Sequence, residues 1–154
     1  MHKMQIGVIG GRSESSQILD DAFIVGREIA RRGAALVCGG MGGVMEAACR
    51  GAKQEGGVAI GIIPDSNPDD ANNFVDYVIA TGMGSARNAL IINSVCGVIA
   101  VSGKFGTLSE ISFALQKGIP VVSLKSWEIS DKIIHKETPE SAVAALFAIL
   151  EKKV

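Results

Sequence analysis

The sequence predicts a single α/β domain over residues 1–154, in which helices cover both faces of a doubly wound, mostly parallel β-sheet. Short apolar segments rich in valine and isoleucine alternate along the chain with segments of helical periodicity. Because these apolar segments show no polar alternation, we expect strands that are buried on both faces, as in parallel sheets. A length of 154 residues fits one domain of this kind.

The apolar segments predict six strands. The expected strands are residues 4–9, 34–38, 58–63, 77–80, 98–101 and 120–124. Strands that alternate with helices in this way are joined by right-handed crossovers. Most of the strands are therefore expected to point the same way, with their carboxyl ends at one edge of the sheet.

Helices are expected between the strands, where apolar residues recur every three or four positions. The residues expected to face the core are Ile18, Ala22, Val25 and Ile29 in the first helix, Met45, Ala48 and Ala52 in the second, and Val143, Leu146 and Leu150 in the last. Between them, one helix is expected to reach about residue 94 and another to span residues 108–117. Thr138 and Pro139 are expected as the N-cap and first residue of the last helix.

Charge and composition exclude several functional classes. Fifteen Lys and Arg residues against 16 Asp and Glu residues give a net charge of −1, so no global basic field favours nucleic acid or a membrane surface. No segment fits a signal peptide, and a cytoplasmic location is expected. Cys38, Cys49 and Cys96 lie far apart in the sequence without C-x-x-C spacing, which predicts buried reduced thiols. The aspartates of the 64–73 loop match no metal-ligand spacing, so a solvated loop and no metal site are expected.

Glycine is the one compositional anomaly, at 19 of 154 residues. The glycines gather where expected strands end, at Gly10 and Gly11, at Gly39, Gly40, Gly42 and Gly43, at Gly82 and Gly84, and at Gly103 and Gly106. Free N–H groups at the start of a helix bind phosphate, and glycine allows the backbone to approach it closely. The clusters therefore predict a phosphate-binding edge. They match neither the Walker pattern nor the dinucleotide pattern G-x-G-x-x-G/A.

Three segments resemble a known superfamily. Residues 101–110, VSGKFGTLSE, resemble the P-G-G-x-G-T-x-x-E motif of the Lonely Guy phosphoribohydrolases, whose members are often mislabelled lysine decarboxylases, and residues 38–45, CGGMGGVM, resemble their G-G-G-x-x-G-L-M motif. Residues 81–88, TGMGSARN, are most similar to the molybdenum cofactor carrier branch. The resemblance spans residues 4 to 150 and implies a Rossmann-like fold. Ser102, Lys104 and Asn88 depart from the hydrolase pattern, which weighs against hydrolysis more than against binding.

The glycine clusters and the resemblance together define the candidate ligand site. Its members are Gly10, Gly11, Ser13, Gly39, Gly40, Gly42, Gly43, Ser85, Arg87, Gly103, Lys104, Phe105, Gly106, Thr107 and Glu110. Arg87 is expected to bind an anion, because a cation in the first turn of a helix opposes the macrodipole. Lys104 is either a solvated lysine or a point charge on a phosphate. Glu110 either closes a capping box with Thr107 or faces the ligand, and Trp127 is expected to contribute packing.

The leading functional expectation is a cytosolic protein that binds a phosphorylated nucleotide or pterin-type molecule. The resemblance implies the molybdenum cofactor as one cargo, with no cofactor or metal required. The alternative is hydrolysis of the N-glycosidic bond of a nucleoside 5′-monophosphate, with Arg87 and Glu110 as the catalytic pair. A homodimer or homotetramer is expected, because Ala89, Leu90, Ile91 and Ile92 surround their helix axis instead of forming one stripe.

Overall fold

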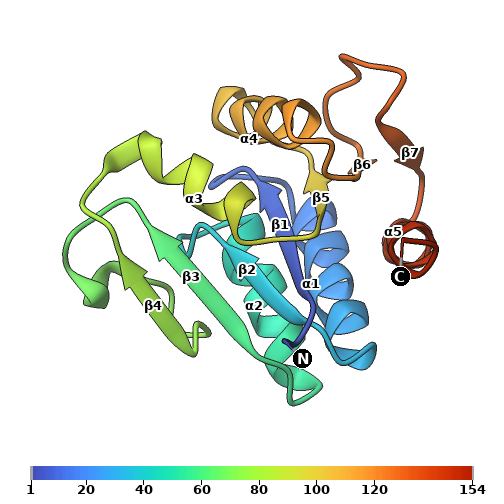
Figure 1. Ribbon diagram of the computed structural model, residues 1–154. Coiled ribbons are helices and arrows are strands. Elements are labelled where there is room, and N and C mark those ends of the chain that lie inside the picture. The colour runs from blue at the N-terminus through green and yellow to red at the C-terminus, as the bar shows by residue number, and fades with distance from the viewer. Residues whose placement is uncertain (1, 154) are drawn as a thin grey trace.

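The protein forms a seven-stranded, wholly parallel sheet with the strand order β4-β3-β2-β1-β5-β6-β7 (Figure 1). The computed structural model describes residues 2–153. The strands are β1 (Gln5–Gly10), β2 (Ala35–Cys38), β3 (Ala59–Ile63), β4 (Tyr77–Ala80), β5 (Gly97–Val101), β6 (Val121–Leu124) and β7 (Ile134–Lys136). The prediction of a doubly wound parallel sheet is confirmed, and all six expected strands are present within one residue of their expected ends.

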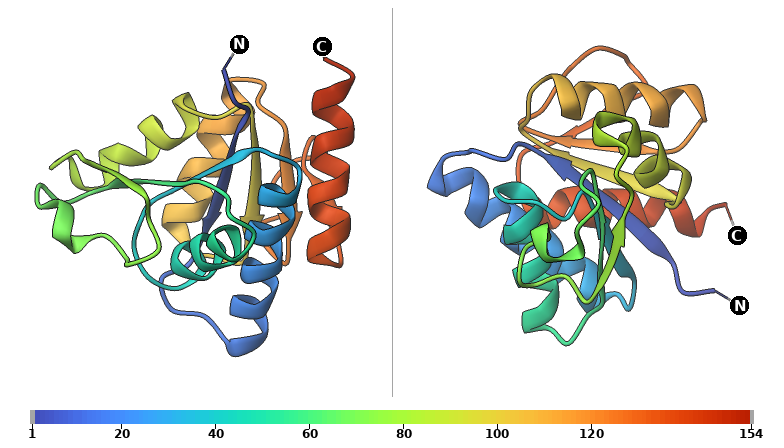
Figure 2. Two further views of the ribbon diagram at one scale, coloured as in Figure 1. Left: turned by 90° about the horizontal axis from the view of Figure 1, so that it is seen from below. Right: turned by 90° about the vertical axis from the view of Figure 1, so that its left-hand side faces the viewer.

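Helices cover both faces of this sheet, as Figures 1 and 2 show. The helices are α1 (Ser16–Arg31), α2 (Val44–Gln54), α3 (Arg87–Asn93), α4 (Phe105–Gln116) and α5 (Pro139–Glu151), with 3₁₀ turns η1 (Pro68–Asp70) and η2 (Gly84–Ala86). One core lies under α1, α2 and α5. It contains the residues predicted to face it in these helices, except Ile18, which is partly buried and packs against it. The other core lies under α3 and α4 and contains Ile91, Ile92 and Ile111.

Helices α1 and α2 contact each other backbone to backbone. A Cβ atom on Gly26 of α1 would lie 1.9 Å from the carbonyl oxygen of Ala48, and one on Gly51 of α2 would lie 2.0 Å from that of Phe23. No side chain fits at either position without moving one helix away from the other. This close contact fixes α2, and with it the loop that connects β2 to α2.

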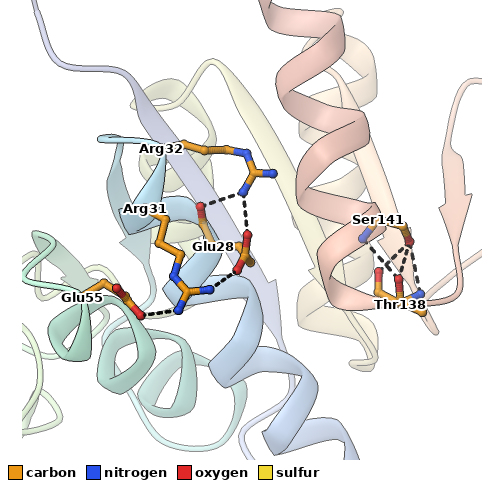
Figure 3. Close-up of polar contacts among 6 residues, drawn as sticks. All are labelled: Glu28, Arg31, Arg32, Glu55, Thr138 and Ser141. Carbon is orange, nitrogen blue, oxygen red and sulfur yellow. Dashed lines mark hydrogen bonds and ion pairs between the residues drawn. The ribbon is translucent and has the colours of Figure 1, made fainter.

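Polar side chains secure the ends of two helices (Figure 3). At the end of α1, Glu28 forms ion pairs of 2.8 Å with both Arg31 and Arg32, and Arg31 also pairs with Glu55 at 2.9 Å. At the start of α5, the Thr138 hydroxyl accepts a hydrogen bond from the Ser141 N–H at 3.2 Å, and the Ser141 hydroxyl reaches back, which completes a capping box. Thr138 is the N-cap that the sequence predicts.

Three structural predictions need correction. Strand β7 is absent from the sequence prediction, because a strand of only three residues, two of them exposed, shows no periodicity. Helix α4 begins at Phe105, three residues before the expected start at Leu108. Cys96 is exposed in the turn that precedes β5, whereas Cys38 and Cys49 are buried with their sulfur atoms 3.4 Å apart.

Two further features concern metals and membranes. Among residues 2–153, no group of three or more His, Cys, Asp and Glu side chains is placed to hold a metal ion. Asp65, Asp69 and Asp70 lie exposed on the loop that leads to β4. In the same part of the chain, no helix has the length and apolar character needed to cross a bilayer.

Candidate functional site

The candidate site lies where the winding direction of the sheet reverses. From β1 the chain adds β2, β3 and β4 on one side, then returns to the other side of β1 with β5. Ligands of open α/β sheets bind at the carboxyl ends of the strands at such a switch point. A pocket of about 350 Å³ occupies this position. It is lined by Val8, Ile9, Gly10, Gly11, Arg12, Ser13, Glu14, Gly39, Met45, Ser85, Arg87, Asn88, Lys104, Gly106, Thr107 and Glu110.

The start of α4 supplies donors for an anion. The N–H groups of Phe105, Gly106 and Thr107 donate no hydrogen bond to any residue from 2 to 153, and the first intrahelical bond runs from Leu108 to the Lys104 carbonyl at 3.0 Å. The positive end of the helix macrodipole adds to the attraction. The loop that leads into α4 turns through left-handed φ angles of 50° at Ser102 and 99° at Gly103.

The loop between β6 and β7 supports the start of α4 from outside the pocket. The Trp127 indole N–H donates to the Lys104 carbonyl at 3.0 Å, and the Ser126 hydroxyl donates to the Ser102 carbonyl at 2.6 Å. The Trp127 ring also lies against that of Phe105, with 6.1 Å between the centroids. Trp127 therefore packs in the fold, as expected, and holds the loop whose N–H groups face the pocket.

Arg87 is buried in the wall of the pocket, with 7% of its surface exposed. Its guanidinium donates to the carbonyl of Ile62 at 2.9 Å, to that of Gly39 at 3.4 Å and to the side chain of Asn88. Burial lowers the pKa of this guanidinium, and the Glu110 carboxyl partly opposes the effect. Arg87 thus ties the ends of β2 and β3 to α3 and places a positive charge beside the ligand space.

Glu110 faces the same pocket from the second turn of α4, with 7% of its surface exposed. No residue in the described chain donates a hydrogen bond to its carboxyl group, because the Arg87 guanidinium is directed elsewhere. Burial raises the pKa of this carboxyl to about 8, against the lowering effect of Arg87. Glu110 is therefore mostly a neutral acid at pH 7, able both to donate and to accept a hydrogen bond.

Of the two alternatives for Glu110, a capping box with Thr107 or a side chain that faces the ligand, the structure excludes the capping box. Lys104 is the N-cap and makes no side-chain capping bond, so Thr107 and Glu110 both lie inside the helix. Thr107 instead packs against Gly103. A Cβ atom added to Gly103 would lie 2.1 Å from the Thr107 hydroxyl oxygen. The T-x-x-E pattern thus places two side chains on the pocket side of α4 and does not mark the helix end.

The structure brings most of the predicted site residues into one pocket. The predicted residues that line it are Gly10, Gly11, Ser13, Gly39, Ser85, Arg87, Lys104, Gly106, Thr107 and Glu110. The predicted residues that do not are Gly40, Gly42, Gly43, Gly103 and Phe105. At Gly43 the reason is a loop contact: a Cβ atom there would lie 2.3 Å from the Gly11 carbonyl oxygen, so this glycine lets the β2–α2 loop pack against the β1–α1 loop.

Six lining residues were not among the predicted site members, namely Val8, Ile9, Arg12, Glu14, Met45 and Asn88. Glu14 and Asn88 also join neighbouring elements through hydrogen bonds. Glu14 reaches from the β1–α1 loop to the β5–α4 loop, where its carboxylate accepts hydrogen bonds from the Gly103 N–H at 3.2 Å and the Ser102 hydroxyl at 3.1 Å. Asn88 donates to the Ser109 hydroxyl at 3.1 Å and links α3 to α4. Glu14 follows a glycine pair at a strand end, which is the one signal that points to it.

Sequence comparisons match nearly the whole chain to one family and to one relative. The sequence model of the SLOG cluster4 family matches residues 3–151. An uncharacterized protein from Archaeoglobus fulgidus is 46% identical over 143 residues, which cover 93% of this chain and 94% of that protein.

Two solved structures resemble the whole chain. The molybdenum cofactor binding protein from the phototrophic bacterium Rippkaea orientalis has a TM-score of 0.92 and 34% identity, covering 97% of this chain and 99% of that one. The molybdenum cofactor carrier protein from Chlamydomonas reinhardtii has a TM-score of 0.88 and 33% identity, with the same coverage. With a family match over nearly its full length, the predicted doubly wound parallel sheet and the glycine-lined switch-point pocket, the chain belongs to the SLOG cluster4 family.

Proposed function

We propose that the protein is a cytoplasmic binding protein that carries a phosphorylated pterin-type molecule, with the molybdenum cofactor as its cargo. The observation that carries this proposal is the pocket that combines the free N–H groups of residues 105–107 with the buried, unpartnered carboxyl of Glu110. The resemblance to two proteins named for binding or carrying the molybdenum cofactor supports the choice of cargo.

The residues present fit such a cargo. The N–H groups at the start of α4 would bind the phosphate, with the exposed Lys104 and Arg12 side chains at the same pocket as further positive charges. A neutral Glu110 would pair with the heterocycle, because the pterin edge alternates hydrogen-bond donors and acceptors and a protonated carboxyl offers one of each. Phosphate and ring would then be held by different groups on the same helix.

The competing activity is hydrolysis of a nucleoside 5′-monophosphate, and the presence of Arg87 and Glu110 in one pocket favours it as the second candidate. Such a reaction passes through an oxocarbenium-like transition state, which an ionised carboxylate stabilises. Burial holds the pKa of Glu110 near 8, so most molecules lack that negative charge at pH 7. This protonation state supports binding over hydrolysis.

The first experiment measures thermal unfolding with neopterin monophosphate, AMP, ribose 5-phosphate and unphosphorylated neopterin. We expect the phosphorylated pterin at 100 times its dissociation constant to raise Tm by roughly 5–10 °C, since that excess stabilises the fold by about 2.7 kcal/mol. Unphosphorylated neopterin is the matched control and is expected to give a much smaller shift. Equal shifts with and without the phosphate, or release of adenine from AMP, would contradict the proposal.

We further infer that the protein assembles as a homodimer or homotetramer through the β4 edge of the sheet. Tyr77 and Ile79 are 65% and 50% exposed on β4, and they pair in register with Ile60 and Ile62, whose side chains belong to the face covered by α3. Met83, which follows β4, is also 50% exposed. An apolar edge strand of this kind requires a partner or some other protection.

Light scattering at micromolar concentration tests this assembly. We expect a mass of at least two chains for the wild type and of one chain for Ile79→Glu, because a charge at the centre of the apolar face opposes its burial. Ile129→Glu is the matched control, since Ile129 is 48% exposed on the β6–β7 loop at the other side of the sheet. A monomeric wild type, or dissociation by both substitutions, would refute the assignment of this face.

A further inference from the structure

Two buried thiols lie in contact beside the candidate site. Cys38 ends β2 and Cys49 lies on α2, and both are fully buried, with their sulfur atoms 3.4 Å apart. Gly39, which directly follows Cys38, lines the pocket, and so does Met45, one helical turn before Cys49. The thiol pair therefore connects the two ends of the β2–α2 loop that borders the pocket, and the proposed function uses neither thiol.

The arrangement of the pair meets the requirements of a disulfide bond. A disulfide forms without backbone movement only where two cysteine side chains point toward each other at short range. Sulfur atoms 3.4 Å apart satisfy this condition, because no other atom fits between them at that distance. The remaining thiol, Cys96, is exposed in the turn before β5, where it donates a hydrogen bond to the Gln5 carbonyl at 3.3 Å.

The surroundings of the pair determine which sulfur reacts first. The Cys49 thiol donates a hydrogen bond to the Cys38 sulfur, and this bond lowers the pKa of Cys38 against the raising effect of burial. The Gly40 N–H, which donates to the same sulfur at 3.3 Å, and the positive charge of Arg87 lower this pKa further. The pKa of Cys49 is raised by the same hydrogen bond and by burial. Because the thiolate is the nucleophile, Cys38 is the sulfur that attacks an oxidant.

We propose that Cys38 and Cys49 form a reversible redox site: hydrogen peroxide oxidises the pair to a disulfide, which ties the end of β2 to α2 and restrains the β2–α2 loop at the pocket. Cys38 attacks one peroxide oxygen, the O–O bond breaks, and the displaced oxygen leaves as water with the thiol proton. The Cys49 sulfur then attacks the resulting sulfenic sulfur. The S–S bond forms, and the sulfenic hydroxyl leaves as a second water with the Cys49 proton.

Thiol counting in a Cys96→Ser protein tests the pair, because this substitution removes only the exposed thiol. The folded protein is incubated with hydrogen peroxide for hours, since buried thiols meet the oxidant only when the chain opens locally. The peroxide is then removed, the chain is unfolded and alkylated with N-ethylmaleimide, and its mass is measured. We expect two alkylated cysteines before oxidation and none after it, a mass lower by two hydrogen atoms, and recovery of both thiols with dithiothreitol.

The matched control is Cys49→Ala in the same Cys96→Ser background, which leaves Cys38 without a partner. We expect this variant to show no loss of two hydrogen atoms. Two free thiols in the Cys96→Ser protein after peroxide treatment, or oxygen added to Cys38 while the Cys49 thiol remains, would overturn the redox site.

Hydrogen exchange measures the effect on the loop. We expect the amide groups of residues 39–48 to exchange more slowly in the oxidised protein, because a disulfide restrains the segment that it closes. The amide groups of α5 are the internal control and should exchange at an unchanged rate. Equal exchange of residues 39–48 in the reduced and fully oxidised proteins would overturn the restraint on the loop. Neither measurement involves a ligand, so failure of the cargo assignment would leave both results unaffected.

Discussion

Replacing Gly106 with valine is expected to weaken binding of a phosphorylated ligand by at least about a hundredfold while leaving the fold intact. Gly106 lies in the first turn of α4, lines the pocket and has no atom within 4 Å of the position of an added Cβ. The valine side chain would fill the space in front of the N–H groups. Loss of two hydrogen bonds to a charged phosphate costs roughly 3–6 kcal/mol, and about 2.7 kcal/mol already corresponds to a hundredfold.

The free energy of unfolding is expected to change by less than about 1 kcal/mol, since valine is slightly better than glycine inside a helix. The matched control is Ser112→Val, which places the same side chain on the exposed side of α4, away from the pocket. For both variants, calorimetric titration with the phosphorylated ligand gives the dissociation constant, and urea unfolding gives the free energy of unfolding. Binding that survives in Gly106→Val would mean that the start of α4 does not hold the phosphate.

The parts of the molecule that the sequence predicts are those controlled by local pattern. Strands β1 and β5 are apolar, apart from Gln5 at the start of β1, because both faces of the sheet are covered, and the sequence pattern shows this directly. Gly10 and Gly106 follow strand ends, and parallel strands bring those ends to one edge, so most of the pocket could be placed without coordinates. Thr138 and Pro139 likewise mark the start of α5 by local chemistry alone.

The parts that could not be predicted depend on contacts between distant segments. Glu14 belongs to no motif, and its hydrogen bond with Gly103 forms only because β1 and β5 lie side by side. In the sequence Gly43 looks like a ligand-binding glycine. In the structure it is required because a side chain there would collide with the Gly11 carbonyl oxygen. The Arg87 guanidinium donates to the carbonyls of Ile62 and Gly39, and no sequence spacing shows these contacts, because they join segments 25 and 48 residues apart.

Replacing Glu110 with glutamine is expected to stabilise the protein relative to the wild type by an amount that grows as the pH rises from 5 to 8. The pKa of Glu110 rises from 4.5 to about 8 on folding, so between these values the folded protein holds a proton that the unfolded chain releases. The wild type therefore loses up to about 1.4 kcal/mol of unfolding free energy per pH unit as the pH rises through this window. Glutamine resembles the protonated acid and does not titrate. Relative to the wild type, Glu110→Gln should gain about 3–4 kcal/mol between pH 5 and pH 8.

Urea unfolding at pH 5, 6, 7 and 8 measures this difference, with Glu137→Gln as the control because Glu137 is an exposed acid before α5. A constant difference between Glu110→Gln and the wild type would show that Glu110 is ionised in the folded protein at neutral pH.

The same variant distinguishes the two functions. A carrier should bind its phosphorylated ligand nearly as well with glutamine at this position, since the amide also donates and accepts. A hydrolase should instead lose about a hundredfold to a thousandfold in turnover, because the charge that stabilises the ribosyl cation is gone. We expect ligand binding to persist in Glu110→Gln, and the wild type to leave AMP intact from pH 5 to pH 9.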